Sequence, residues 1–317
     1  MRIYRRFIPL FQSARAVLNN RWVRRAILWL VLALSAIYLA MNMRNAQDLL
    51  KGLTPRYDLL ILALLLTTSA VLLGAVGWGF SLRALHQDIP WVSMISIHLG
   101  SNLAKYLPGY AWQLAGKAYL TSHEGVKPKV VASAMILEMS QLMLLGSGLS
   151  LVMLPQAMIN TWLSQGYSDL TRVFCRILGV LLLVITPILL TSIFEKTSSR
   201  IGIPGVRRSA VLASSGAILI GWITFSLAYY LMGKALLDLM AGQFAGFVFT
   251  LTASFLIGLL IVIVPGSLGV RESLMVYFLS LIQIPSAMAA LIAVLSRLMV
   301  TLSEISSYLI YRYVTRN

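Results

Sequence analysis

The segment Leu59–Leu82, with the sequence LLILALLLTTSAVLLGAVGWGFSL, contains 24 residues and no Asp, Glu, Lys or Arg. A helix needs roughly 20 such residues to cross about 30 Å of hydrocarbon. The segment is therefore predicted to form a transmembrane helix. Other apolar segments near or above this length, and therefore also predicted to span, are Ala26–Met43, Val130–Leu154, Val173–Phe194, Ala210–Met232 and Ala287–Tyr311.

The composition of the whole chain agrees with a membrane protein. Of its 317 residues, 59% are hydrophobic and only 11% are charged, and the mean hydropathy is +0.84. This apolar share exceeds that of an average soluble domain and excludes a soluble globular enzyme. The single cysteine, Cys175, excludes an intrachain disulfide, a thiolate metal cluster and a CxxC redox pair.

The first 25 residues carry seven arginines among bulky apolar residues. This pattern is typical of a basic amphipathic segment that lies on a membrane surface. A signal peptide is the competing interpretation, but its basic region would be unusually long, and Ala26–Met43 ends without a clear small-x-small cleavage site. We therefore expect a basic segment at residues 1–25, followed by a single transmembrane domain over residues 26–317.

Two apolar regions are interrupted by a Pro-Gly pair. Trp91–Leu120 contains Pro108-Gly109, and Phe244–Leu281 contains Pro265-Gly266. Broken backbone at membrane depth is tolerated where protein or a wet cavity satisfies its polar groups, so both regions are predicted to be re-entrant hairpins. The second region has a longer leading arm and could instead form two tilted spans. The expected fold is all-α and polytopic, with about six full transmembrane helices and two hairpins.

The net charge of +16 is distributed unevenly over the loops. With a cytoplasmic N-terminus, the cytoplasmic side collects the seven N-terminal arginines and also Arg83, Lys127, Lys129, Lys196, Arg200, Arg207, Arg208, Arg312 and Arg316. This distribution follows the positive-inside rule and predicts that both termini are cytoplasmic. Three full spans separate the hairpins, so the hairpins are expected to enter from opposite faces. That arrangement predicts an inverted repeat with halves at about 59–154 and 210–311.

Polar residues inside apolar segments point to the functional site, because an intramembrane ion is functional by default. In the first hairpin, Gln113 and Lys117 follow Gly109 and Tyr110, where a helix N-terminus would favour an anion. In the second hairpin, Gly266 and Ser267 precede Arg271 and Glu272 in the same way. The alternatives are that Lys105 and Lys117 snorkel to an interface, and that Arg271 and Glu272 form a structural pair.

The full spans hold a second polar set. Glu138 lies centrally in its segment with Gln141 one turn later, and Arg297 and Glu304 are seven residues apart, near one face of a helix. Glu138 is predicted either to tie helices together or to titrate protons that drive transport. For Glu304, which lies near a segment end, the tie is the preferred interpretation.

Signals for other chemistry are absent from the sequence. There is no HExxH, P-loop or GxSxG motif, and His86, His98 and His123 are too scattered for a metal set. We expect no metal, no cofactor and no nucleic-acid partner. An intramembrane enzyme would have to use Glu138 and His98 as acid and base, but no catalytic constellation is recognisable, so the protein is expected not to be an enzyme.

Two motifs resemble signatures of a known family. The stretch Ser101–Gly109 (SNLAKYLPG), followed by Trp112-Gln113 and Gly116-Lys117, and the stretch Val264–Glu272 (VPGSLGVRE) are similar to the lysylphosphatidylglycerol synthase transmembrane-domain family, in its Lys-Tyr-x-Pro-Gly branch. Glu138 and Ser296-Arg297 also fall where that family often has Glu and Arg. The chain departs from the family at Lys117, which is commonly Arg, and at Met139, where many relatives have Arg.

The resemblance implies a lipid-handling membrane protein of the cytoplasmic (inner) membrane. Because the chain ends six residues after Tyr311, we expect the separate aminoacyl-transfer domain of bifunctional relatives to be missing. The leading expectation is a translocase for a phospholipid or a polyprenyl-phosphate-linked lipid. Residues expected to bind an anionic headgroup are Gly109, Tyr110, Gln113, Lys117, Gly266, Ser267, Arg271 and Arg297, and a coupling or polar network is expected from Glu138, Gln141, Glu272 and Glu304.

Two alternatives to this expectation remain open. A cationic lipid would instead need Glu138, Glu272 and Glu304 along its path. A protein that does not transport would serve as a membrane partner subunit of a cell-envelope glycosyltransferase or lipid synthase.

Overall fold

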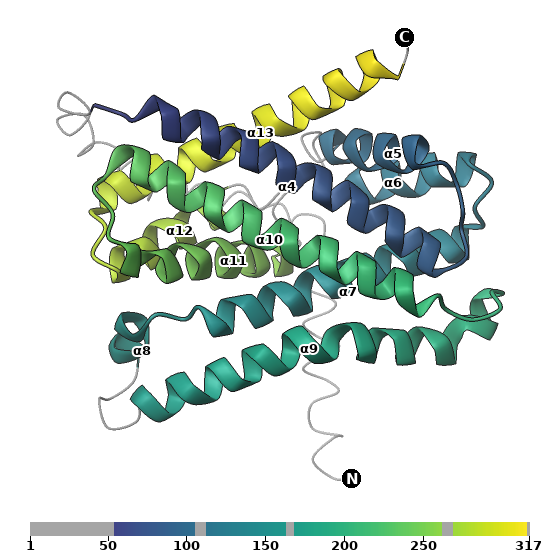
Figure 1. Ribbon diagram of the computed structural model, residues 1–317, viewed down its shortest axis with the longest axis horizontal. Helices are drawn as coiled ribbons and strands as arrows, with labels where there is room; N and C mark the ends of the chain where they lie inside the picture. Colours follow the sequence, from purple (N-terminus) through teal and green to yellow (C-terminus); the bar gives the residue numbers. More distant parts are fainter. Residues whose placement is uncertain (1–53, 105–111, 163–167, 262–268, 316–317) are drawn as a thin grey trace, which may run out of the picture.

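A computed structural model describes residues 54–104, 112–162, 168–261 and 269–315, and these residues form helices and short connections (Figure 1). The helices are α4 (Tyr57–Ala84), α5 (Trp91–Leu103), α6 (Trp112–His123), α7 (Pro128–Val152), α8 (Gln156–Trp162), α9 (Ser168–Ile201), α10 (Arg208–Leu236), the short 3-10 helix η3 (Ala241–Gln243), α11 (Phe244–Leu260), α12 (Val270–Leu281) and α13 (Ser286–Val314). The expected all-α fold is confirmed for this part of the chain.

Six of the described helical segments are long and apolar enough to cross a membrane. Five of them coincide with predicted spans and correspond to α4, α7, α9, α10 and α13. The sixth is Ala241–Leu260, which consists of η3 followed directly by α11. The predicted first span, Ala26–Met43, and the basic segment 1–25 lie outside the described residues. The chain is a multi-pass membrane protein.

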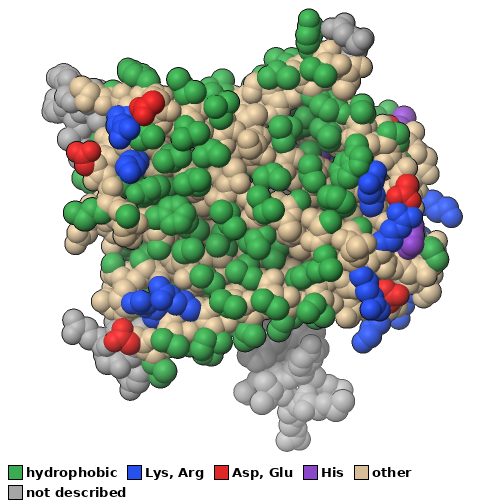
Figure 2. Space-filling view, viewed as in Figure 1, with side chains coloured by type: hydrophobic (Ala, Val, Ile, Leu, Met, Phe, Trp, Pro, Cys, Tyr) green, Lys and Arg blue, Asp and Glu red, His purple; other side chains and the backbone are tan. Residues whose placement is uncertain are grey.

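The surface is typical of a protein surrounded by lipid. Figure 2 shows a broad apolar zone between two bands of charged side chains at opposite ends of the molecule. Helix α9 exposes Phe174, Ile177 and Val184 along its length, each more than half accessible. Side chains this large and apolar are stable at the surface only against hydrocarbon or a protein partner.

Proline residues set the starts of three helices. Pro90 and Pro285 immediately precede α5 and α13, and Pro128 is the first residue of α7. Proline is favourable at a helix start because the N–H groups of the first turn have no acceptor within the helix, so the N–H that proline lacks is not needed there. The proline ring also holds φ near its helical value.

The two regions with Pro-Gly breaks each contain a pair of helices in contact, α5 with α6 and α11 with α12. Helices α5, α6 and α12 have 13, 12 and 12 residues, too few to span a bilayer. The second region therefore combines one helix of spanning length with one short helix, and does not form two full spans. Both breaks, Pro108-Gly109 and Pro265-Gly266, lie outside the described residues, so re-entry itself stays a prediction.

The two proposed halves each place a pair of helices between two long helices, but α11 with η3 reaches spanning length whereas α5 and α6 do not. Helices α4 to α7 run long, short, short, long, and α10 to α13 begin and end with long helices around the pair α11 and α12. Helices α4 and α10 pack side by side, and the α5–α6 pair lies at the opposite end of the molecule from α12 (Figure 1). The inverted repeat itself stays a prediction.

The connection between α4 and α5 is fastened to the start of α10. The Arg207 guanidinium donates hydrogen bonds from Nη1 and Nη2 to the two carboxylate oxygens of Asp88, both at 2.6 Å, and the Arg207 N–H donates to the Ala84 carbonyl at 2.9 Å. The hydrogen bonds from Arg207 hold the pKa of Asp88 below its usual range. This contact holds the α4–α5 connection, and with it the start of α5, against α10.

Helices α10 and α11 approach closely at Gly233, which gives a testable prediction. A Cβ at this position would lie 2.5 Å from Cε1 of Phe247, a fully buried ring. We expect Gly233→Ala to lower the free energy of unfolding by about 1–3 kcal/mol, the usual effect of overpacking. Gly216→Ala in the same helix is the control, because no described atom lies within 4 Å of its added Cβ. Thermal unfolding in detergent measures both, and equal stability of the two variants would contradict the prediction.

Candidate functional site

A cavity of about 310 Å³ lies between eight helices, α4 to α7 and α10 to α13. Its walls are mostly apolar, with aromatic side chains Trp222, Phe225 and Phe255 on one side. The polar and charged residues in the walls are Thr67, His98, Asn102, Gln113, Lys117, Glu138, Arg271, Arg297 and Glu304. The cavity therefore brings both predicted hairpin regions and the predicted polar residues of α7 and α13 to one place.

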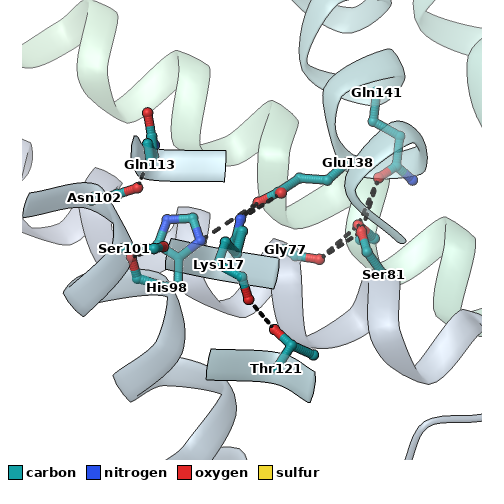
Figure 3. Close-up of polar contacts among 11 residues, drawn as sticks. Gly77, Ser81, His98, Ser101, Asn102, Gln113, Lys117, Thr121, Glu138 and Gln141 are labelled. Carbon is teal, nitrogen blue, oxygen red and sulfur yellow. Dashed lines mark hydrogen bonds and ion pairs between the residues drawn. The ribbon is translucent and has the colours of Figure 1, made fainter. Parts of the chain in front are cut away.

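Lys117 and Glu138 form a buried ion pair between α6 and α7 (Figure 3). The Lys117 Nζ donates to both carboxylate oxygens of Glu138, at 2.8 and 2.6 Å, and the two side chains are 6% and 12% exposed. The same Nζ lies 4.0 Å from the centroid of the Trp78 ring. Because both oxygens of the carboxylate hold one ammonium, Lys117 is committed to a protein partner and does not snorkel to an interface.

His98 of α5 stands beside this pair. Its Nδ1 is 3.5 Å from Oε1 of Glu138, and it has no hydrogen-bond partner among the described residues. Nearby, Gln113 Nε2 of α6 donates to Asn102 Oδ1 of α5 at 2.8 Å. These contacts fasten the two short helices to each other and set them against α7.

A second ion pair joins α12 to α13. Arg297 Nη1 donates to Glu272 Oε1 at 3.0 Å, and the other oxygen of Glu272 accepts a hydrogen bond from the Gly269 N–H at 2.8 Å. The Glu272 side chain is 8% exposed and is not among the described residues that line the cavity. It therefore caps the start of α12 and neutralises Arg297, which is the structural role considered for it from the sequence, although with Arg297 in place of Arg271.

Arg271 differs from the other two basic residues in the wall. It is 9% exposed, and its Nε and Nη2 have no hydrogen-bond partner within the described part of the chain. The guanidinium carbon lies 5.4 Å from the Phe255 ring centroid and 5.8 Å from that of Phe225. Buried charges are ordinarily paired, because an unpaired one is strongly destabilising. The arrangement can accept an anionic group.

Gln141 does not line the cavity, although it follows Glu138 by one turn. Its side chain is fully buried, accepts a hydrogen bond from Ser214 Oγ at 2.8 Å and donates to Ser215 Oγ at 2.9 Å. Ser81 of α4 belongs to the same cluster (Figure 3). Gln141 therefore ties α7 to α4 and α10, apart from the Lys117–Glu138 pair.

Comparison with known proteins identifies the family of the chain. The family model described as "lysylphosphatidylglycerol synthase TM region" matches residues 26–303. The chain belongs to this family. The match takes in both signatures and Glu138, and it gives the protein a membrane lipid-related function. Comparisons with curated proteins and with solved structures found no match.

Most of the residues singled out from the sequence of this family member are brought together. Gln113, Lys117, Glu138, Arg271, Arg297 and Glu304 all line the cavity. The predicted helix-terminus residues Gly109, Tyr110, Gly266 and Ser267 lie outside the described residues, so their role stays a prediction. The sequence did not single out the aromatic wall, which consists of Trp222, Phe225 and Phe255. In a spanning segment, the residue type alone does not show whether an aromatic side chain faces a cavity, the lipid or the protein core.

Proposed function

We propose that this member of the lysylphosphatidylglycerol synthase TM region family is a lipid translocase and not an enzyme. It moves a phospholipid or a polyprenyl-phosphate-linked lipid between the leaflets of the cytoplasmic membrane, with both termini in the cytoplasm. The observation that carries this proposal is the buried guanidinium of Arg271, with two N–H-bearing nitrogens unpartnered in the described structure, in the wall of a cavity between membrane-spanning helices.

In this proposal the headgroup phosphate accepts hydrogen bonds from Arg271. Hydrogen bonds from a guanidinium to phosphate are charge-assisted and are about twice as strong as neutral ones. The aromatic rings of Phe225 and Phe255 restrict the guanidinium and exclude water around it. The apolar chains of the lipid remain against the apolar walls and the bilayer.

Movement between leaflets would use the two hairpin regions in turn. The α5–α6 pair and α12 lie toward opposite ends of the molecule, and each contributes to the cavity wall (Figure 1). Alternate opening of the two regions would expose the same cavity first to one leaflet and then to the other, as in transporters built from inverted repeats.

The pairing of Glu138 and Glu272 argues against a cationic cargo that would use these two carboxylates. Glu138 is occupied by Lys117, and Glu272 by Arg297. A cationic headgroup would have to break these pairs and leave a buried cation behind. For the same reason we assign Glu138 to the α6–α7 tie and not to proton coupling.

The proposal is tested with the purified full-length protein in liposomes that contain a fluorescent phosphatidylglycerol. Dithionite added outside bleaches only outer-leaflet label, so a translocase is expected to make the protected inner-leaflet fraction disappear, whereas protein-free liposomes retain it. Retention of the protected fraction at every protein-to-lipid ratio, with native mass spectrometry showing no bound lipid, would exclude the translocase.

A further inference from the structure

We infer that the cargo presents one singly charged phosphodiester to the cavity, and that lipids linked through a pyrophosphate are rejected. This inference rests on the proposed function and narrows its substrate class. The inference follows from two observations. Lys117 and Arg297 are paired with carboxylates, and the Nε and Nη2 atoms of Arg271 have no hydrogen-bond partner in the described structure.

Two of the three Lys and Arg side chains described in the wall are already paired with carboxylates. Lys117 is held by both oxygens of Glu138 at 2.6 and 2.8 Å, and the pair is almost fully buried. Arg297 is held by Glu272 at 3.0 Å. Each pair is neutral as a unit, and in a medium of low dielectric constant a separated pair is far less stable than a joined one. Neither cation is available to a second phosphate.

The third cation, Arg271, has a geometry that suits one phosphodiester. Its unpartnered atoms, Nε and Nη2, form one edge of the planar guanidinium, from which two N–H bonds point in parallel. A phosphodiester has two non-bridging oxygens that can accept both bonds, in the bidentate manner of arginine–phosphate contacts. One guanidinium thereby neutralises one phosphate and uses both unpartnered nitrogens.

A pyrophosphate would bring at least one more negative charge into the same cavity. The rings beside the Arg271 guanidinium, Phe225 and Phe255, cannot neutralise that negative charge. Two further ionisable residues line the wall: Glu304 is acidic and adds no capacity for anions, and His98 stands beside Glu138, with its Nδ1 3.5 Å from Oε1. To compensate the second phosphate, Lys117 or Arg297 would have to leave its carboxylate, and that carboxylate would then be buried without its partner.

The experiment compares two synthetic lipids that share one short prenyl chain and one hexose and differ only in the linkage, phosphodiester or pyrophosphate. Binding to the full-length protein in detergent is measured by native mass spectrometry. Both lipids are also used unlabelled as competitors of fluorescent phosphatidylglycerol translocation in liposomes. We expect the phosphodiester to bind and compete at least about tenfold better.

The outcomes separate the inference from the proposed function. Equal or better binding and competition by the pyrophosphate lipid, with phosphatidylglycerol still translocated, would overturn the inference alone. Absence of binding and of any protein-dependent translocation would overturn the proposed function and the inference with it.

Removing a paired carboxylate charge gives a second test. Glu272→Gln retains an amide oxygen for Arg297 but removes the negative charge that Glu272 places beside it, so we expect the preference for the phosphodiester to shift by about tenfold or more toward the pyrophosphate. Glu138→Gln removes the carboxylate charge beside Lys117 and is expected to shift the preference in the same direction. This second variant replaces the first if Glu272→Gln does not fold. Glu195→Gln is the matched control, because Glu195 is an exposed residue of α9 away from the cavity. An unchanged preference in both folded wall variants would contradict the inference.

Discussion

Arg271→Met is expected to reduce protein-dependent lipid translocation by roughly ten- to hundredfold, the loss that follows from removing hydrogen bonds of about 1.5–3 kcal/mol to a charged group. The same substitution is expected to leave the unfolding temperature unchanged or to raise it. Arg271 is nine-tenths buried with Nε and Nη2 lacking hydrogen-bond partners among the described residues, so the Phe225 and Phe255 rings offset only part of its desolvation. The liposome assay and thermal unfolding in detergent measure the two effects on the same preparation.

Two further variants make this prediction specific. Arg200→Met removes an arginine from the exposed surface of α9 and should change neither translocation nor stability. Arg271→Lys keeps the charge but loses the two-pronged edge, so it should recover only part of the activity. Full activity of Arg271→Met would exclude Arg271 as the anion site, and a large loss of stability would show that the guanidinium has a structural role.

Lys117→Met is expected to lower the free energy of unfolding by about 3–5 kcal/mol, because Glu138 would be left as a buried carboxylate without its partner. Glu138→Leu should be destabilising to a similar degree. The double variant Lys117→Met with Glu138→Leu is expected to recover most of the stability, since an apolar pair of similar volume needs no desolvation. Denaturant or thermal unfolding of the four proteins in detergent gives the coupling energy directly.

An exposed ion pair of the same chain provides the control. Arg56 Nη2 and Asp58 Oδ2 are 3.1 Å apart, but the two side chains are 58% and 65% exposed. The corresponding cycle should yield a coupling of at most about 1 kcal/mol, as is usual for solvated pairs. If losses at Lys117 and Glu138 were additive, the two residues would not act as a pair, and Lys117 would again be available to an anion.

The long helices were predictable from local sequence because burial in hydrocarbon is decided by the apolar character of about 20 consecutive residues. The predicted span Leu59–Leu82 lies within helix α4, and four other predicted spans agree with α7, α9, α10 and α13. The exception was Phe244–Leu281. Its longer leading arm was visible in the sequence and reaches spanning length in Ala241–Leu260, but the sequence left open whether the second arm also spans, and α12 has only 12 residues.

The candidate site was predictable as a set of residues but not as a set of contacts. Intramembrane charges are rare, so Lys117, Glu138, Arg271 and Arg297 stand out in any apolar segment. The sequence did not predict which of these charged residues form ion pairs with each other. Arg271 and Glu272 are neighbours in sequence, yet Glu272 turns to Arg297 of the next helix. Gln141, one turn from Glu138, joins a different cluster with serines of α10.

For this chain, the amino-acid sequence was sufficient to establish a polytopic all-α membrane protein and to select the few charged residues worth attention, because both follow from the free energy of transfer into a bilayer, residue by residue. Tertiary packing was needed to distinguish one open cation from two neutralised ones. Ion pairs form between side chains that helix packing brings together, 21 residues apart for Lys117 and Glu138 and 25 for Arg297 and Glu272. No local pattern encodes the packing geometry that leaves Nε and Nη2 of Arg271 without a partner in the described structure.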